Sequence, residues 1–284
     1  MSNDGIVELD GFKLAYSIEG NGEPVLVVGS KVYYPQLFSK QLRKQLKLIF
    51  IDHKGHVKPS RDLKPEDYTL DRILEDIEMM REKLCLEDFV ILGHSGNAFL
   101  ALEYAKKYPS YVRKVVLLNS APTNSQERQE QSISFFNQTA SPERKSKFEK
   151  DIALLANDME KEPEKRFAHM CIRMGAHSFY DSTLDATPMW NGVYTNMPVI
   201  DYLWGEVFGK LNMIESLTNF EKPVFLGLGK YDYLVGPSSL WDSIEGKLSN
   251  VTKVIFERSG HNPMLEEPDL FDSHLIKWIQ EDRR

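Results

Sequence analysis

Residues 89–97 read Phe-Val-Ile-Leu-Gly-His-Ser-Gly-Asn, and a segment of mixed apolar and charged residues follows as far as Lys107. Residues 89–92 are apolar throughout, which is typical of a strand buried on both faces. From Ala98 onward, apolar residues recur at helical spacing with Glu and Lys opposite them, which predicts a helix. A Gly-x-Ser sequence between a strand and a helix predicts a sharp turn that presents the Ser95 hydroxyl as a nucleophile.

The predicted helix begins directly behind Ser95, so its free N–H groups and its positive end face the serine. The N–H of Gly96 is the best placed to donate to a substrate oxygen that becomes negative, and we predict it as an oxyanion-hole donor. Gly93 and Gly96 supply the small residues that such a turn needs. The comparable string Gly236-Pro237-Ser238 follows no strand directly, so it predicts only a turn.

Strands and helices alternate on both sides of this turn. Asp10-Gly11 joins two β-rich runs and predicts an antiparallel hairpin. Near-continuous apolar runs elsewhere predict parallel strands buried on both faces. The predicted strands are residues 6–9, 12–19, 24–29, 46–51, 89–92, 112–118, 223–228 and 251–257, and the clearest helices are 69–84, 98–107 and 268–281.

The alternation stops near Ala121 and resumes near residue 216. Between these points the sequence changes to charged helices and to loops rich in Met and aromatic residues. We therefore predict one α/β core, residues 1–121 and 216–284, with a helical cap inserted at residues 122–215. At 284 residues the chain has room for one large domain with such an insertion.

A serine hydroxyl needs a base to remove its proton and an acid to orient that base. Asp232 follows the strand predicted at 223–228, and His261 follows the strand predicted at 251–257. Parallel α/β sheets collect their functional residues at the carboxyl ends of the strands. We therefore predict that Ser95, His261 and Asp232 meet there as nucleophile, base and orienting acid.

The string Gly260-His261-Asn262-Pro263-Met264-Leu265-Glu266-Glu267-Pro268 and the order Ser95, Asp232, His261 resemble the α/β-hydrolase superfamily along essentially the whole chain. The resemblance implies a mostly parallel eight-stranded sheet with an antiparallel N-terminal hairpin, helices on both faces and a helical cap. It also implies a second oxyanion donor, carried here by the N–H of Ser30. The family's usual His-Gly pair is replaced before Ser30 by Val28-Gly29.

Two further motifs depart from the family pattern. Residues 52–57, Asp-His-Lys-Gly-His-Val, resemble its Asp-x-Arg-Gly-His turn with Lys54 in place of Arg. The resemblance implies a structural role for this turn. Asn97 ends the Ser95 turn, where Gly, Ala or Ser is usual; its amide is either accommodated by packing or reaches the pocket. We count Asn97 and Lys31 among the candidate substrate-binding residues.

The predicted cap holds more Met and aromatic residues than a small helical layer needs for its own core. We predict that Trp190 and Trp204 line a largely apolar pocket suited to an acyl or aryl group. As an alternative, Glu206 could bind a substrate amine, as in the prolyl aminopeptidases of this superfamily. A metal site at His53 and His56 lacks a third ligand, so we predict no metal and no cofactor.

Composition narrows the classes of partner. The net charge is −7, and no block of basic residues provides the surface that nucleic acid or an anionic membrane would need. The two cysteines form no CxxC pair, and the polar start of the chain does not resemble a signal peptide. We therefore expect a cytoplasmic monomer or homodimer that acts on a small molecule and does not span a membrane.

Together these features predict a serine hydrolase that cleaves a carboxylic ester or related acyl bond of a small apolar substrate through an acyl-enzyme. A prolyl aminopeptidase-like hydrolase of small amides is the first alternative. The second, from a different class, is a hydrolase-fold receptor that turns its ligand over slowly or not at all.

Overall fold

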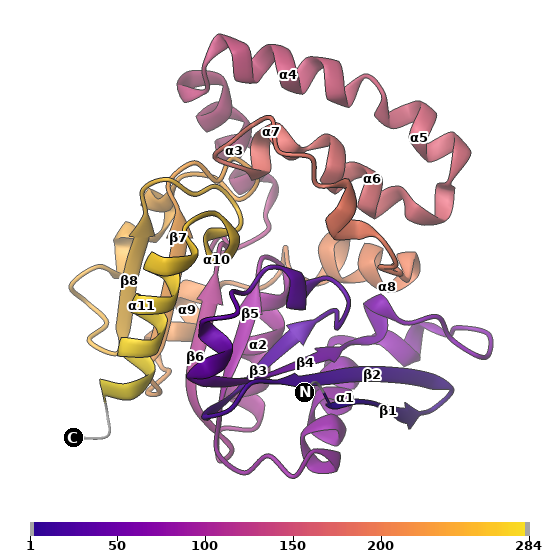
Figure 1. The fold of residues 1–284 in the computed structure, drawn as a ribbon, viewed down its shortest axis with the longest axis vertical. Helices are drawn as coiled ribbons and strands as arrows, with labels where there is room; N and C mark the ends of the chain where they lie inside the picture. The colour runs from indigo at the N-terminus through magenta and orange to yellow at the C-terminus, as the bar shows by residue number, and fades with distance from the viewer. Residues whose placement is uncertain (1–2, 282–284) are drawn as a thin grey trace.

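Eight strands form one sheet in the order β1-β2-β4-β3-β5-β6-β7-β8 (Figure 1). The computed structural model describes residues 3–281. Strands β1 and β2 are antiparallel, β2 pairs antiparallel with β4, and the remaining neighbours are parallel, which confirms the predicted fold class. The strands are β1 Asn3–Leu9, β2 Phe12–Glu19, β3 Glu23–Gly29, β4 Leu46–Asp52, β5 Phe89–His94, β6 Val112–Leu118, β7 Val224–Gly229 and β8 Val251–Phe256.

The predicted hairpin turn lies at Asp10 and Gly11, which join β1 to β2. Their φ angles are 49° and 84°, so both residues adopt the left-handed conformation. A two-residue turn of this kind matches the right-handed twist of the paired strands, and Asp-Gly adopts it at low cost. The turn therefore sets the register in which Leu9 lies opposite Phe12.

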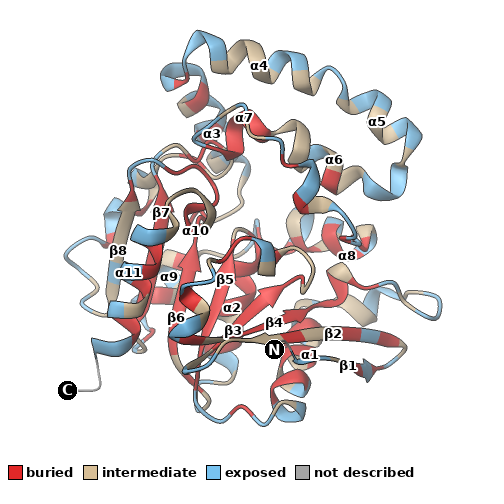
Figure 2. Cartoon of the chain, in the orientation of Figure 1, coloured by how far each residue is buried: buried red, intermediate tan, exposed pale blue. Residues whose placement is uncertain are grey.

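Alternate residues of the central strands enter two separate apolar cores. Leu26 and Ile91 contribute to one core, while Val27 and Leu92 contribute to the other, and all four are fully buried. Figure 2 shows the central strands buried along most of their length. Burial of both faces explains why the apolar runs in the sequence are continuous.

Helices cover both faces of the sheet. Helices α1 Leu70–Lys83 and α2 Asn97–Lys107 contribute to the first core, and α11 Pro268–Gln280 contributes to the second. The Thr69 side chain begins α1 by accepting a hydrogen bond from the Arg72 N–H. The short helix α10 Pro263–Glu266 directly precedes α11. Within residues 3–281, no helix combines the length and the apolarity needed to cross a bilayer.

The chain leaves the sheet after β6 and returns to it at β7. We call residues 122–215 the helical insert; its exact boundaries stay a prediction. Figure 1 shows most of its helices as a separate layer above the sheet. The helices between β6 and β7 are α3 Gln126–Thr139, α4 Pro142–Ile152, α5 Leu155–Lys161, α6 Arg166–Arg173, α7 Gly175–Ser178, α8 Met197–Tyr202 and α9 Met213–Thr218.

Candidate active site

Ser95 occupies a sharp turn between β5 and α2. Its φ angle is 58°, a left-handed conformation that costs energy for serine and that the surrounding structure must maintain. The Ser95 N–H donates to the Leu118 carbonyl at 2.8 Å, which ties the turn to β6. A Cβ atom at Gly93 would lie 2.2 Å from the Asn97 carbonyl oxygen, so strand and helix can approach this closely only with glycine there.

Asp232 and His261 come together in the loops after β7 and β8. The distance from His261 Nδ1 to Asp232 Oδ2 is 2.7 Å, and both side chains are buried. The other carboxylate oxygen of Asp232 accepts the N–H groups of Leu234 at 3.1 Å and Val235 at 3.3 Å. An ionised Asp232 holds the proton on Nδ1 of His261, which leaves Nε2 as the acceptor that a general base needs.

His94 joins the Ser95 turn to the His261 loop. Its Nε2 lies 2.7 Å from the His261 carbonyl oxygen, and the two imidazole rings have centroids 4.6 Å apart. The Ser95 hydroxyl makes no hydrogen bond to any residue of the described range 3–281. Catalytic hydrogen bonds are often long without substrate and shorten in the reacting complex.

The N–H groups of Ser30 and Gly96 have no acceptor among the described residues. Ser30 is buried at the end of β3, and its hydroxyl accepts the N–H groups of Val32 and Tyr33, both at 3.2 Å. Gly96 stands at the start of α2, where helix N–H groups lack partners within the helix. Gly96 directly follows Ser95 in the sequence, and free N–H groups of this kind can receive a negative oxygen.

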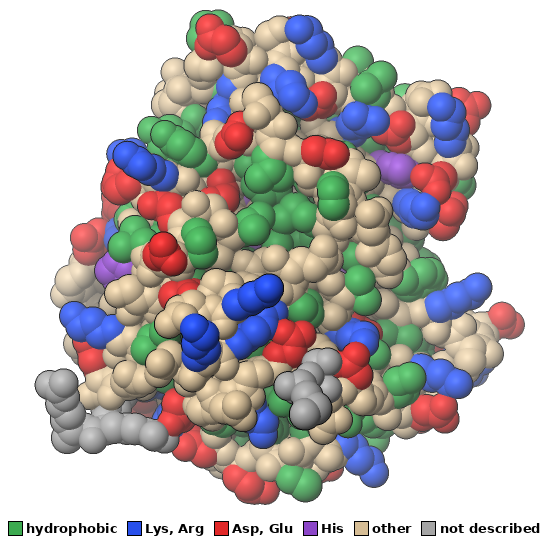
Figure 3. Space-filling model, viewed as in Figure 1, with side chains coloured by type: hydrophobic (Ala, Val, Ile, Leu, Met, Phe, Trp, Pro, Cys, Tyr) green, Lys and Arg blue, Asp and Glu red, His purple; other side chains and the backbone are tan. Residues whose placement is uncertain are grey.

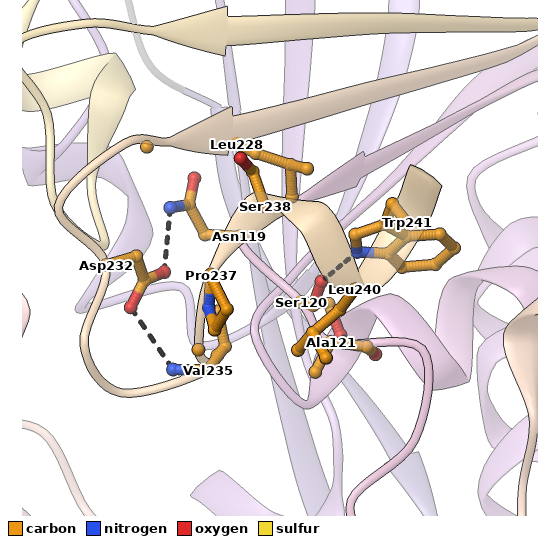
Figure 4. Close-up of a pocket in the computed structure, with 12 residues that line it drawn as sticks. Asn119, Ser120, Ala121, Leu228, Asp232, Val235, Pro237, Ser238, Leu240 and Trp241 are labelled. Atoms are coloured by element: carbon orange, nitrogen blue, oxygen red, sulfur yellow. Dashed lines mark hydrogen bonds between the residues drawn. The ribbon is translucent and has the colours of Figure 1, made fainter. Parts of the chain in front are cut away.

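Asn119 supports the acid and was not found by sequence reasoning. Its Nδ2 donates to Asp232 Oδ2 and to the Gly260 carbonyl, both at 2.8 Å, so it joins the acid loop to the base loop. A small pocket next to this contact is lined by Asn119, Asp232 and Trp241 among others, and Ser95 is not one of them (Figure 4). In the sequence, the only sign of a role for Asn119 was its position directly after β6, at the edge of the sheet where α/β folds bind ligands.

The helical insert contacts both of these loops through α7. The carbonyl of His177 accepts the Tyr233 N–H at 3.0 Å, and the carbonyl of Ser178 accepts the His261 N–H at 2.5 Å. From the core side, the Glu266 carboxylate accepts the N–H groups of Gly260 and Asn262, both at 3.0 Å. Burial raises the pKa of Glu266. Backbone hydrogen bonds from two directions therefore fix the His261 loop.

Aromatic side chains of the insert extend from Gly96 towards Tyr33. A Cβ atom at Gly96 would lie 2.4 Å from the Trp204 ring, so this indole packs against the serine turn. Phe167 has its ring centroid 5.6 Å from that of Trp204 and 5.7 Å from that of Trp190. Trp190 in turn lies 4.8 Å from Tyr33, three residues after Ser30. The side chains of Tyr33, Phe167, Trp190 and Trp204 are only partly buried. Figure 3 shows hydrophobic side chains gathered in the middle of one face of the molecule.

Two residues predicted to bind substrate, Lys31 and Asn97, have protein partners in the structure. The Lys31 ammonium lies 3.3 Å from Asp4, and its backbone N–H donates to Asp52 at 2.7 Å. The Asn97 side chain is buried and bonded to other buried side chains. Glu206, the alternative amine anchor, is exposed on a π-helical turn, Leu203–Val207.

The turn at residues 53–56 has its own partners. The Gly55 N–H donates to Nδ1 of His53 at 3.0 Å, and His56 contacts the Tyr194 carbonyl at 3.2 Å. Lys54 forms a fully buried ion pair with Asp76 at 2.8 Å. In the described part of the chain, no group of three or more His, Cys, Asp or Glu residues is arranged to hold a metal ion.

Known proteins resemble this chain over nearly its full length. A family model described as the alpha/beta hydrolase fold matches residues 18–268. The AB hydrolase superfamily protein YclE of Bacillus subtilis (strain 168) is 56% identical over 99% of this chain and all of the relative. A proline iminopeptidase of Heyndrickxia coagulans is 26% identical, covering 95% of this chain and 96% of the relative.

One solved structure extends the comparison to three dimensions. An esterase from Exiguobacterium antarcticum superposes with a TM-score of 0.70 at 17% sequence identity, and the match covers 97% of this chain and 98% of the esterase. At 17% sequence identity, this structural similarity is evidence for a shared fold alone. The matches of the family model and of the Bacillus relative, together with the eight-stranded sheet, establish that the chain belongs to the α/β-hydrolase family.

Proposed function

We propose that the chain is a serine hydrolase that cleaves a carboxylic ester or related acyl bond through an acyl-enzyme. Ser95 is the nucleophile, His261 the base and Asp232 the acid that orients it. The observation that carries the proposal is the 2.7 Å contact between His261 and Asp232, in loops held next to a serine with a φ angle of 58°. Strained nucleophile turns of this kind are characteristic of catalytic serines.

In the proposed reaction, Ser95 Oγ attacks the acyl carbon while its proton passes to Nε2 of His261. The carbonyl oxygen becomes negative and accepts the N–H groups of Ser30 and Gly96. His261 then gives its proton to the departing alcohol, which leaves an ester on Ser95. A water molecule loses a proton to His261, attacks that ester and releases the carboxylic acid, and Ser95 regains its proton.

The aromatic side chains near Gly96 favour a small, largely apolar acyl group. Trp190 and Trp204 provide apolar, planar surfaces, and the pair Trp204–Gly96 leaves little room directly above the serine turn. We extend the proposal to the helical insert, which would act as the cap that selects substrate. Lys31 and Asn97 stay predictions as substrate contacts, and their present partners favour structural roles.

Similar proteins include an esterase and a proline iminopeptidase, so ester and amide cleavage are the two reactions to compare. An aminopeptidase needs an acidic group that binds the free amine of its substrate. Glu206, the candidate for this task, is exposed to solvent. We therefore favour the ester hydrolase over the aminopeptidase.

The direct test is turnover of p-nitrophenyl acetate and butyrate, beside an L-prolyl anilide, by the wild-type chain and Ser95→Ala. We expect the esters to be cleaved with many turnovers, and Ser95→Ala to lose about four or more orders of magnitude in kcat. Ser238→Ala, which alters the chain's similar Gly-Pro-Ser string, is the matched control and should retain activity. Cleavage of the anilide alone would favour the aminopeptidase, and a single slow turnover would favour the receptor.

A further inference from the structure

Four buried side chains next to the triad form a continuous chain of hydrogen bonds. Nε2 of His53 lies 3.1 Å from Oδ1 of Asn97, and Nδ2 of Asn97 lies 2.9 Å from the Tyr34 hydroxyl. The Tyr34 hydroxyl lies 3.4 Å from Nδ1 of His94, whose Nε2 lies 2.7 Å from the His261 carbonyl. All four residues are buried, with exposed fractions of 1% for His53, 4% for Asn97, 4% for Tyr34 and 2% for His94.

Each hydrogen bond of this chain has a direction fixed by its neighbours. The Gly55 N–H donates to Nδ1 of His53, so the His53 proton lies on Nε2 and is donated to Asn97. The Asn97 amide then donates to Tyr34, which leaves the Tyr34 hydroxyl proton for His94, whose Nδ1 and backbone carbonyl oxygen both lie 3.4 Å from the hydroxyl. His94 donates from Nε2, since its partner there is a carbonyl oxygen. Burial lowers the pKa of both His53 and His94 well below the ordinary histidine value, which keeps both rings neutral.

The chain joins the loops on which the proposed reaction depends. We call residues 30–34 the oxyanion loop, after the proposed donor Ser30. Within it, the Tyr34 N–H donates to the Ser30 carbonyl at 3.1 Å. His94 and Asn97 stand on either side of the Ser95 turn. A Cβ atom at Gly29 would lie 2.0 Å from the Tyr34 ring and 2.9 Å from Asn97 Nδ2, so the oxyanion loop packs directly on this contact.

We propose that Asn97 and Tyr34 are positioning residues that hold the oxyanion loop, the Ser95 turn and the His261 loop in one arrangement. The amide of Asn97 provides both an acceptor for His53 and a donor for Tyr34, which Gly or Ala at this position cannot do. The Tyr34 hydroxyl connects the turn to His94 and so to the backbone of the base. This inference rests on the proposed serine hydrolase.

The test is the rate at which a fluorophosphonate labels Ser95, together with kcat and KM for p-nitrophenyl acetate. Tyr34→Phe keeps the ring and removes only the hydroxyl. We expect labelling and kcat to fall about tenfold, the effect of losing one buried hydrogen bond that the active arrangement needs. KM should stay near the wild-type value, because Tyr34 is bonded to protein groups on both sides.

Tyr104→Phe is the matched control for loss of a buried tyrosine hydroxyl. Tyr104 is fully buried on α2, the helix that begins with Asn97, and its hydroxyl donates to Glu78. We expect this variant to lose thermal stability while Ser95 is labelled at the wild-type rate. A similar slowing of labelling in Tyr104→Phe and Tyr34→Phe would reduce the effect to general destabilisation and overturn the proposal.

Asn97→Ala tests the same chain from its other side and serves if Tyr34→Phe fails to fold. We expect slower labelling in Asn97→Ala, and no further slowing when it is added to Tyr34→Phe, because Asn97 reaches His94 through Tyr34. Additive effects, or wild-type rates in folded variants, would overturn this inference alone. A wild-type chain that is not labelled at Ser95 would contradict the proposed hydrolase and this inference with it.

Discussion

Strands β5 and β7 are buried at every residue, whereas helices α4 and α5 of the helical insert have no buried residue. Figure 2 shows the same contrast between the sheet and the outermost helices. Buried strands hold the loops at their carboxyl ends rigidly, and these loops carry Ser95, Asp232 and His261. Partly exposed helices can change shape or sequence at little cost to the core. Under the proposed function, the chemistry belongs to the sheet and the selectivity to the insert.

The two regions are nevertheless joined at defined points. On one side, α7 accepts the N–H groups of Tyr233 and His261. On the other side, the Asn196 N–H donates to the Gly55 carbonyl at 2.8 Å, and the Asn196 side-chain amide donates to the Val57 carbonyl at 3.2 Å. A change in the insert at α7 therefore acts on the loops that carry Asp232 and His261.

The largest expected effect concerns chemistry in the core. In Asp232→Asn, an amide can present a donor to Nδ1 of His261 and so favour the tautomer that cannot act as base. We expect kcat for p-nitrophenyl acetate to fall by about four orders of magnitude with little change in fold. Asp242→Asn is the control, since Asp242 is exposed and forms an ion pair with Lys253. Activity within tenfold of wild type in Asp232→Asn would remove Asp232 from the triad.

The next effect concerns stability of the core. Lys54→Met removes the nearer cation of the buried Asp76 carboxylate and leaves it with the Arg72 guanidinium at 3.9 Å. We expect the free energy of unfolding at pH 7 to fall by about 3–5 kcal/mol in urea denaturation. Lys13→Met, which breaks an exposed pair with Glu8, should cost less than about 1 kcal/mol. Equal losses in the two variants would contradict a structural role for the turn at residues 53–56.

A change in the insert should alter selectivity instead. Trp204→Ala removes the indole that packs on Gly96, so longer acyl chains should fit. We expect the ratio of kcat/KM for p-nitrophenyl octanoate to that for the acetate to rise about tenfold. Glu206→Ala, on the same turn but exposed, should leave this ratio unchanged. A uniform loss on both esters in Trp204→Ala would argue that the indole supports the serine turn rather than the pocket.

The smallest effect concerns the junction at α7. The His177 ring stacks on Phe136, with ring centroids 3.7 Å apart, and meets Phe148 edge-on at 4.3 Å. Burial lowers the pKa of His177 from 6.5 to about 4. As pH falls, the unfolded chain therefore protonates His177 at a higher pH than the folded chain does. The free energy of unfolding falls as pH drops from 6.5 towards 4. The contribution of one such histidine is about 1.4 kcal/mol per pH unit. Urea denaturation of His177→Phe should show a weaker dependence on pH in this range, and an unchanged slope would contradict the assignment.

Much of the core could be predicted from sequence because burial on both faces leaves a local pattern. The apolar runs identified the parallel strands, and Asp10-Gly11 identified the hairpin. Ser95, Asp232 and His261 were predicted because all three follow predicted strands, Ser95 and His261 within motifs and Asp232 by its position; their catalytic roles stay predictions. The structure brings the last two together at 2.7 Å.

The supporting residues could not be predicted because their partners are distant in the sequence. Asn97 was noted as unusual, but the direction of its amide depends on Tyr34 and His53, which lie 63 and 44 positions away. Asn119 reaches Asp232 across 113 positions and belongs to no motif. Helix α7 has four residues, too few for a periodic pattern, although its carbonyls contact both triad loops. Such contacts depend on tertiary packing, which a single sequence does not display.

The most direct measurement is mass spectrometry of the wild-type chain after reaction with a fluorophosphonate. We expect one adduct per chain, on the peptide that contains Ser95, and release of one equivalent of p-nitrophenol in a burst when a p-nitrophenyl ester is the substrate. An unmodified chain, or an adduct confined to a residue other than Ser95, would contradict the assignment of Ser95 as the nucleophile.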